Sequence, residues 1–594
     1  MSLPIEKHIE FYKAEYAVQE QDWLYYVQSP IKTLIASKER EMYAGFASGI
    51  ERHSGLLLLK VRNESAPRLN QPYFLSVVLE PKTPPKGWSI TYQQFREKHH
   101  IDYYEGIGGT IVPINYWKTE GNFTFFLCES LDDELIPLIE QECFSKSIYP
   151  LVLLAESDPP LDYLVNLKEF LEKNKSNKIV NSTGDNRSAL SLQNLDNGQD
   201  IIPFLLKDIN EKEITLIQGP PGTGKSYTAA AIANEYINNN KSVVICSLAN
   251  KGLIEIIGQN TLKEALNARK VHKTSLSSLE KKEQPKLKKA TEIIPIEGKL
   301  LLTTYYSLSK YFKAYKGNKY RFDLLIIEEA SQAFLATIAM FIEISERTLI
   351  IGDFKQIPPV VRLEKRQINR IHPNLNQAIN GLETFTLNKT ESTYRFTKTR
   401  RLTASSANLT GLFYENSLES ISSLTLPVAN SSKYKNIFND SGNPTIVFLP
   451  KESSNPLSSF HFVDKLLQIV MSLLETSNEC TVAILASKRD MEAVLIREFY
   501  SKYGKLKRVH FSTVHRAQGL TVDYCFFYMP LEATHMDLNP NLFNVATSRA
   551  RKGTCILTKD SMNMMVNTSA EVQSFLKGCQ DVTKTFTEFM EVEF

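Results

Sequence analysis

The sequence lacks the features of a secreted or membrane protein. Its seven cysteines are scattered along 594 residues and include no CxxC pair, so neither a zinc site nor a disulfide framework is predicted. The longest apolar runs are short, such as the four leucines at 56–59, which excludes a transmembrane helix. The first residues lack the basic and apolar regions of a signal peptide. We therefore predict a cytoplasmic protein with no membrane partner.

A strong charge of either sign is also missing. The chain has 69 Lys and Arg against 66 Asp and Glu, a formal net charge of +3. Bulk electrostatics does not indicate a nucleic-acid binder, and any such site must be a local groove. An apolar content of 42% with 23% charged residues is typical of a folded globular protein.

What the sequence does contain is a phosphate-binding loop. An apolar strand signal at 214–218 leads into the letters GPPGTGKS at 219–226. Backbone N–H groups of such a loop close around a polyphosphate, the lysine reaches the β- and γ-phosphates, and the serine hydroxyl ligates Mg²⁺. The residues predicted to hold a nucleoside triphosphate are Gly219, Pro220, Pro221, Gly222, Thr223, Gly224, Lys225 and Ser226.

Further polar residues follow at the ends of later strand signals. Glu328 and Glu329 end an apolar run, where one carboxylate is expected to hold Mg²⁺ and the next to orient the attacking water. Gln356, after the next strand, is expected to hydrogen-bond the γ-phosphate or that water. Arg395 and Arg549 are expected to reach the γ-phosphate across a cleft and couple hydrolysis to closure. Alone, each of these residues is more often an ordinary surface residue; their order after the phosphate loop gives them weight.

The strand and helix signals predict an α/β protein built from two doubly wound parallel sheets. Residues 1–175 form a helical and β-barrel accessory region, and the polar residues 176–194 form a linker. Residues 195–396 and 397–594 each alternate strands with helices. A lysine-rich helical insertion is predicted at 252–298, which fits a solvated surface as well as a nucleic-acid contact.

Taken in order, these segments resemble the motifs of superfamily 1 helicases, in the branch of the nonsense-mediated-decay RNA helicase and its bacterial AAA-domain relatives. The similar segments are GPPGTGKS at 219–226, LAN at 248–250, TT at 303–304, EEASQ at 328–332, GDFKQIPP at 352–359, TYR at 393–395, FSTVHRAQG at 511–519 and NVATSRA at 544–550. Upstream, LDNGQ at 195–199 is similar to the adenine-reading glutamine motif.

The resemblance implies two RecA-like domains that hydrolyse ATP between them and step along single-stranded DNA or RNA, 5′→3′. In that family Gln199 would read adenine with Tyr394 packed against it, while Lys225, Arg395 and Arg549 contact phosphates. The residues implied to line the nucleic-acid channel are Asn250, Thr304, Thr513, His515 and Arg516. The strand-rich stretch at 50–130 would be the family's β-barrel. One departure is Glu328, which stands where the motif usually has Asp.

Two other functions fit part of the pattern. A nucleotide-operated switch or partner-remodelling ATPase would keep the motor fold without unwinding, and single strands would not stimulate its ATPase. A GTPase is disfavoured because the near matches NKGL at 250–253 and NKTE at 388–391 lack the aspartate that reads guanine.

Overall fold

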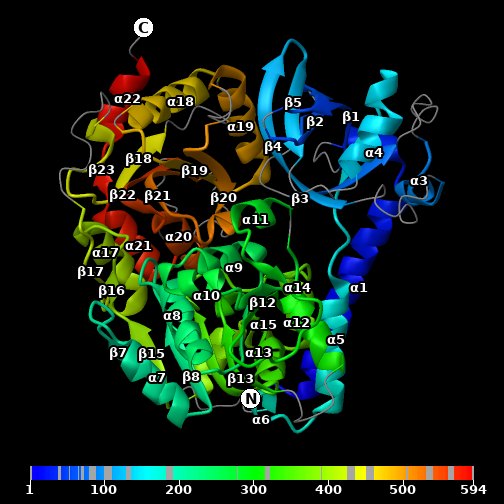
Figure 1. Ribbon diagram of the computed structural model, residues 1–594. Coiled ribbons are helices and arrows are strands. Elements are labelled where there is room, and N and C mark those ends of the chain that lie inside the picture. The colour runs from blue at the N-terminus through cyan, green and yellow to red at the C-terminus, as the bar shows by residue number, and fades with distance from the viewer. Residues whose placement is uncertain are drawn as a thin grey trace.

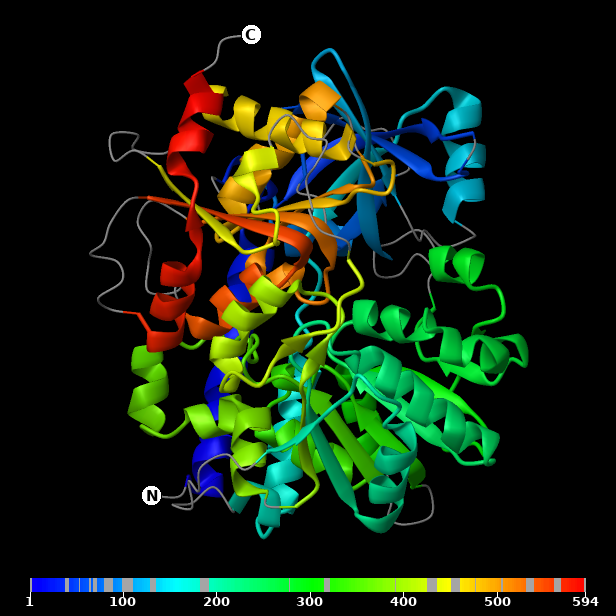
Figure 2. The same cartoon turned by 90° about the vertical axis from the view of Figure 1, so that its left-hand side faces the viewer.

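The computed structural model describes most of the chain (Figures 1 and 2). The described residues are 3–37, 42–52, 54–63, 66–67, 72–78, 89–98, 110–128, 135–181, 192–276, 278–314, 321–389, 391–424, 435–449, 460–475, 477–503, 506–529, 539–559 and 568–591. Two α/β halves lie one above the other, and a small barrel lies beside the second half (Figure 1).

The accessory region consists of long helices and a closed barrel. Helix α1 (Ile5–Gln28) packs against α5 (Leu161–Lys173), and both lie along the first half (Figure 1). The barrel order is β1-β2-β5-β4-β3-β6, with every pair antiparallel. Its strands are β1 (Tyr43–Ile50), β2 (Leu57–Arg62), β3 (Pro72–Val78), β4 (Thr110–Glu120), β5 (Phe123–Cys128) and β6 (Leu151–Ala155), and its helices are α2 (Ile31–Ala36), α3 (Tyr92–Lys98) and α4 (Leu135–Glu142).

The first half is a parallel sheet of nine strands, in the order β11-β10-β12-β9-β13-β14-β8-β15-β7. Its central strands β9 and β13 are mostly apolar and almost fully buried because helices cover both faces. The strands are β7 (Gln193–Leu195), β8 (Ile214–Gln218), β9 (Val243–Ser247), β10 (Val271–Lys273), β11 (Lys288–Lys289), β12 (Leu300–Thr304), β13 (Phe322–Ile327), β14 (Ser345–Gly352) and β15 (Thr393–Phe396). The helices are α7 (Ile202–Glu211), α8 (Lys225–Asn238), α9 (Asn250–Ile257), α10 (Lys263–Asn267), α11 (Ser278–Glu283), α12 (Tyr305–Ala314), α13 (Leu335–Ile342), α14 (Lys365–Ile371), α15 (Asn376–Ile379) and α16 (Gly381–Asn388).

The second half is a parallel sheet of six strands, in the order β20-β19-β21-β22-β18-β23. The strands are β18 (Thr445–Leu449), β19 (Val482–Ala486), β20 (Val509–Thr513), β21 (Val522–Tyr528), β22 (Ala550–Lys559) and β23 (Gln580–Asp581). The helices are α17 (Ala404–Gly411), α18 (Phe460–Glu475), α19 (Arg489–Tyr503), α20 (Pro540–Thr547), α21 (Ala570–Gly578) and α22 (Thr583–Glu591), and a separate strand pair joins β16 (Lys398–Thr399) to β17 (Glu419–Ser420).

The predicted fold class is confirmed, with two corrections in detail. The insertion at 252–298 is not only helical, because β10 and β11 extend the first sheet at its edge. The predicted linker at 176–194 is structured at both described ends: helix α6 (Lys178–Asn181) buries Val180, and β7 pairs with β15. Residues 182–191 of that stretch lie outside the described residues. None of the helices described is long and apolar enough to cross a membrane.

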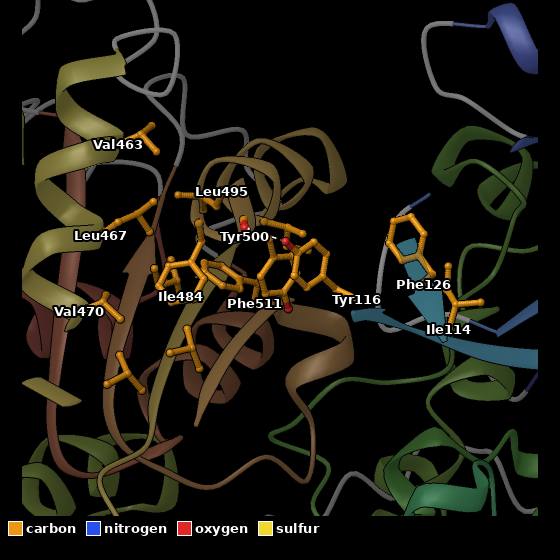
Figure 3. Close-up of a cluster of buried hydrophobic side chains, with 14 of the residues drawn as sticks. Ile114, Tyr116, Phe126, Val463, Leu467, Val470, Ile484, Leu495, Tyr500 and Phe511 are labelled. Carbon is orange, nitrogen blue, oxygen red and sulfur yellow. Dashed lines mark hydrogen bonds between the residues drawn. The ribbon is translucent and has the colours of Figure 1, made fainter. Parts of the chain in front are cut away.

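The barrel is joined to the second half through an aromatic contact (Figure 3). Tyr116 of β4 stacks on Tyr500 of α19, with ring centroids 4.8 Å apart and an interplanar angle of 14°. The Tyr116 hydroxyl also donates a hydrogen bond to the Tyr500 carbonyl oxygen at 3.0 Å. Because α1 and α5 pack on the first half, the accessory region touches both halves.

Candidate nucleotide site

A cavity of about 230 Å³ lies between the two halves. The first half lines it with the phosphate loop and the ends of β13 and β14, and the second half lines it from the opposite side. The lining residues used below are Pro221, Gly222, Thr223, Gly224, Lys225, Ser226, Glu328, Glu329, Asp353, Gln356, Arg401 and Arg549. Residues more than 300 positions apart in the sequence therefore share one site.

The phosphate loop connects β8 to the N-terminus of α8. Gly222 and Gly224 have φ angles of 74° and 89°, a left-handed conformation that glycine adopts without strain. A Cβ on Gly222 would lie 2.4 Å from the Arg401 Cβ, so the position needs glycine for space as well. Lys225 donates from Nζ to the Gly219 carbonyl oxygen at 2.5 Å, and burial lowers its pKa. The loop and the positive end of α8 can hold an anion.

Two carboxylates face this loop from the end of β13. The Ser226 hydroxyl donates to Glu328 Oε1 at 3.4 Å, and the buried Glu328 Oε2 has no hydrogen-bond partner among the described residues. Glu329 has a φ of 51° and accepts a hydrogen bond from Ser247 Oγ at 3.3 Å. Burial, together with neighbouring carboxylates, raises the pKa of both glutamates. An unpartnered carboxylate oxygen beside a serine hydroxyl fits a hard cation such as Mg²⁺.

Gln356 belongs to a polar network that crosses the cleft. Its Nε2 donates to Asp353 Oδ2 at 2.8 Å, and the Tyr414 hydroxyl of the second half donates to the same oxygen at 2.6 Å. Asn544 of α20 donates from Nδ2 to the Tyr414 hydroxyl at 2.7 Å and to the Lys355 carbonyl oxygen at 2.9 Å. A movement of either half therefore reaches Gln356 through direct hydrogen bonds.

Two arginines of the segments after Phe396 line the cavity. Arg549 is 1% exposed, and its Nε donates to the Val545 carbonyl oxygen at 2.7 Å. Arg401 donates from Nη1 to the Ser548 carbonyl oxygen at 3.2 Å. Burial lowers the pKa of Arg549 to about 10 and that of Arg401 to about 9, and each guanidinium stays charged at neutral pH. The cavity thus places concentrated positive charge opposite the phosphate loop.

Arg395 does not reach this cavity, contrary to the prediction. It lies on β15 beside β8, and its Nε donates to Gln218 Oε1 at 2.8 Å. It also forms an ion pair with Glu415 at 3.2 Å. These contacts hold the side chain against Gln218 and Glu415, and it is not among the residues that line the cavity. Arg401, six residues later, lines the cavity instead.

Gln199 and Tyr394 also lie away from the described cavity lining. Gln199 is exposed in a turn. The Tyr394 hydroxyl donates to Asp208 Oδ1 at 3.0 Å, and its ring packs edge-on against Phe204 at 5.6 Å. The glutamine segment nevertheless reaches the loop through Asn197, which sequence reasoning missed: its Nδ2 donates to the Thr223 carbonyl oxygen at 2.6 Å.

The five residues predicted to line a nucleic-acid channel lie at the carboxyl ends of the two sheets. Asn250 begins α9 directly after β9, and Thr304 ends β12 in the first half. Thr513 ends β20 in the second half, and His515 and Arg516 lie in the 3₁₀ turn that follows, Val514–Ala517. Asn250 and His515 are exposed, whereas Thr513 is buried.

The two edges also approach each other. A Cβ added to Gly519, just after the 3₁₀ turn, would lie 3.7 Å from Glu255 Oε2 and 4.0 Å from Lys251 Cε on α9. Gln518 accepts a hydrogen bond from Gln332 Nε2 at 2.7 Å, which is a further contact across the cleft.

Comparisons with known proteins agree with this geometry. Residues 205–362 match the family of AAA domains. The chain is 27% identical over 190 residues to the DNA replication ATP-dependent helicase/nuclease dna2 of Schizosaccharomyces pombe, covering 27% of this chain and 13% of that protein. It is 39% identical over 46 residues to the DNA polymerase alpha-associated DNA helicase A of the same organism, covering 8% of this chain and 7% of that protein. Both relatives are named as helicases.

The similarity to these relatives is partial. A third relative, the replicase polyprotein 1ab of Alphamesonivirus 1, is 24% identical over 373 residues, which is 60% of this chain and 7% of that protein. The chain thus spans 13% or less of the length of these relatives. Among solved structures, the Arterivirus nonstructural protein 10 helicase covers 91% of this chain and 80% of its own, at 12% identity and a TM-score of 0.38.

Proposed function

We propose that this protein is an ATP-dependent helicase or translocase that moves along single-stranded DNA or RNA in the 5′→3′ direction. One observation carries the proposal: the cavity that holds the phosphate loop of one half is lined by Arg549 of the other. Arginines in this position stabilise charge on the γ-phosphate, and they do so only while the two halves are closed.

In the proposed reaction, the loop from Gly219 to Ser226 binds the phosphates of ATP, and Ser226 and Glu328 hold Mg²⁺. The cation would neutralise charge on the β- and γ-phosphate oxygens. Glu329 orients the attacking water with its carboxylate, while Lys225 supports the γ-phosphate. Arg401 and Arg549 complete the positive surroundings of the transferring group.

The same cavity suggests how hydrolysis would move the two halves. Loss of the γ-phosphate removes the anion that both arginines face, so the attraction across the cleft weakens. Gln356 would lose a contact with the γ-phosphate and shift. Its hydrogen bond to Asp353, and those that link Asp353 to Tyr414 and Asn544, would transmit that shift to the second half. Opening and closing then alters the distance between the sheet edges that carry Asn250 and Thr304 on one side and Thr513, His515 and Arg516 on the other.

Nucleic-acid binding at those edges is part of the proposal. Hydroxyls, amides and a few cations along a groove hold a phosphate backbone without reading bases. The predicted boundaries at 175, 194 and 396, and the cytoplasmic location, belong to the proposal as well; deletion variants and cell fractionation test them.

The test is ATP hydrolysis by the full chain with and without matched DNA and RNA oligomers, followed by unwinding of 5′- and 3′-tailed duplexes. We expect stimulation by at least one type of single strand and unwinding only of the 5′-tailed duplex. Absence of stimulation by both poly(dT) and poly(U) would instead favour a nucleotide-operated switch.

A further inference from the structure

The outer wall of the barrel carries aromatic rings where a solvent-facing sheet normally has polar residues. On β2, Leu57, Leu59 and Val61 point into the barrel core, so Lys60 between them points outward. Phe125 lies on the less buried side of β5. Phe46 of β1 and Trp117 of β4 are 45% and 38% exposed.

Strand register brings these outward side chains into one row. Phe46 of β1 pairs with Lys60 of β2, Lys60 pairs with Phe125 of β5, and Phe125 pairs with Lys118 of β4. Neighbouring strands lie about 4.8 Å apart, so the row presents a ring or a cation at each step. Trp117 joins the row at the irregularity of β4, with its ring edge-on to Phe125 at 6.2 Å.

The cations of the row lie over the ring faces. Lys60 Nζ is 4.2 Å from the centroid of Phe123 and 5.8 Å from that of Phe125. Lys118 Nζ is 4.3 Å from the centroid of Trp117, although it also pairs with Glu120. Arg62 lies at the exposed end of β2, in register with Phe123 of β5. We call the surface formed by Phe46, Lys60, Trp117, Lys118, Phe123 and Phe125 the barrel aromatic face.

We propose that the barrel aromatic face binds single-stranded nucleic acid, as a second contact outside the channel between the two halves. Alternating rings and cations match such a strand, whose bases stack on aromatic side chains while its phosphates meet lysines. A protein partner fits less well, because lysine is depleted from the core of protein–protein interfaces. The choice of occupant rests on the proposed function, whereas the geometry of the face does not.

The barrel aromatic face lies on the domain that also contacts both halves. Tyr116, the residue before Trp117, stacks on Tyr500 of the second half. A strand held on this face is therefore anchored to an element that touches the moving half, which would keep a long strand associated through the opening of the cleft.

The experiment measures equilibrium binding of a fluorescent single strand of about 30 nucleotides at low salt, long enough to exceed a single site of about 4 to 16 nucleotides. The variants are Lys60→Glu and Trp117→Ala, with Lys60→Arg as the charge-conserving variant. Lys207→Glu is the matched control, because Lys207 is an exposed lysine of α7 in the first half. Circular dichroism and the basal ATPase without strand report folding, and none of these residues lines the nucleotide cavity.

We expect Lys60→Glu and Trp117→Ala each to weaken binding by about 5-fold or more, as for loss of one stacking or phosphate contact. Lys60→Arg and Lys207→Glu should stay within about twofold of wild type. Lys60→Glu should also lower the slope of log affinity against log salt by about 0.7. If both variants bind the strand within about twofold of wild type, the proposed site on the barrel is overturned, but the proposed function is not. Wild-type protein that neither binds the strand nor responds to it in ATPase contradicts the proposed function itself.

Discussion

Tyr414 of the second half donates a hydrogen bond of 2.6 Å to Asp353 of the first half, which also holds Gln356. Both side chains are buried, and burial together with Asp353 raises the pKa of Tyr414 well above its ordinary value. The phenol therefore stays protonated at neutral pH and can donate this hydrogen bond. This bond connects the residue that holds Gln356 at the nucleotide cavity directly to the second half.

Removal of the Tyr414 hydroxyl should weaken the coupling between the two halves without preventing ATP from binding in the cavity. We expect Tyr414→Phe to lower strand-stimulated turnover several-fold with little change in KM for ATP, and to cost about 1 kcal/mol of stability. The measurement is steady-state ATPase together with chemical denaturation. Tyr236→Phe is the control, because the Tyr236 hydroxyl bonds Asn210 within the first half. Equal strand-stimulated turnover in the Tyr414→Phe and Tyr236→Phe variants would show that the Tyr414 hydroxyl does not couple the two halves.

Glu329→Gln should separate binding from hydrolysis. The amide keeps the shape of the side chain but cannot act as the carboxylate that orients water, so we expect turnover to fall by about 10² to 10⁴-fold. Binding of a fluorescent ATP analogue should persist. Glu343→Gln, a glutamate on the far side of the first half that Asn177 contacts, serves as the control. Near-normal turnover of Glu329→Gln would exclude Glu329 from the reaction.

Arg401 and Arg395 distinguish the observed site from the one expected from sequence. Arg401→Ala removes a guanidinium from the cavity and should lower turnover by about 10³-fold or more. Arg395→Ala removes the donor to the buried Gln218 Oε1 and should lower the melting temperature, with a smaller loss of turnover in the protein that remains folded. Paired measurements of turnover and melting temperature check both. A folded Arg395→Ala protein without activity, beside an active Arg401→Ala, would reverse the assignment.

The buried glutamates give the nucleotide-free protein a pH-dependent stability. The pKa of Glu328 is raised from 4.5, mainly by burial, so the folded state favours its protonated form. The stability that this provides is present below pH 4.5 and is lost as pH rises through the higher folded pKa. We expect Glu328→Gln to raise the melting temperature at pH 8 more than at pH 5, measured without nucleotide. An equal shift in melting temperature at the two pH values, or a larger one at pH 5, would show that burial of the Glu328 carboxylate does not destabilise the protein at high pH.

The same variant should behave oppositely when ATP is present. Glu328→Gln lacks the carboxylate proposed to hold Mg²⁺, so added Mg²⁺ and ATP should stabilise it less than wild type. A melting series with and without the two ligands measures this difference. Equal stabilisation of both proteins would place Mg²⁺ on other groups.

How far the sequence alone predicts the structure depends on how local the signal is. The β8 strand, the phosphate loop and α8 are consecutive, so their apolar run, glycines and alanines predict them within one or two residues. The strands β10 and β11 were missed because they are two or three residues long and lysine-rich, and only pairing with β12 makes them strands.

The arginines show the same limit at the site. Arg395 lies on β15 of the first sheet and Arg401 follows six residues later, and nothing in their immediate neighbours tells which one lines the cavity. The parallel pairing of β15 with β8 decides it, because that pairing directs Arg395 toward Gln218. Arg401 reaches the cavity because the chain after β15 passes over the loop, where the Arg400 N–H donates to the Gly222 carbonyl oxygen at 3.0 Å. Such long-range contacts leave no periodic trace in a sequence.

The most direct measurement is ATP turnover by Arg549→Ala at saturating ATP and single strand, with ATP affinity measured in parallel. If an arginine of one half acts on a triphosphate held by the other, turnover should fall by about 10³-fold or more while affinity changes by less than about tenfold. Turnover within about twofold of wild type would contradict this account.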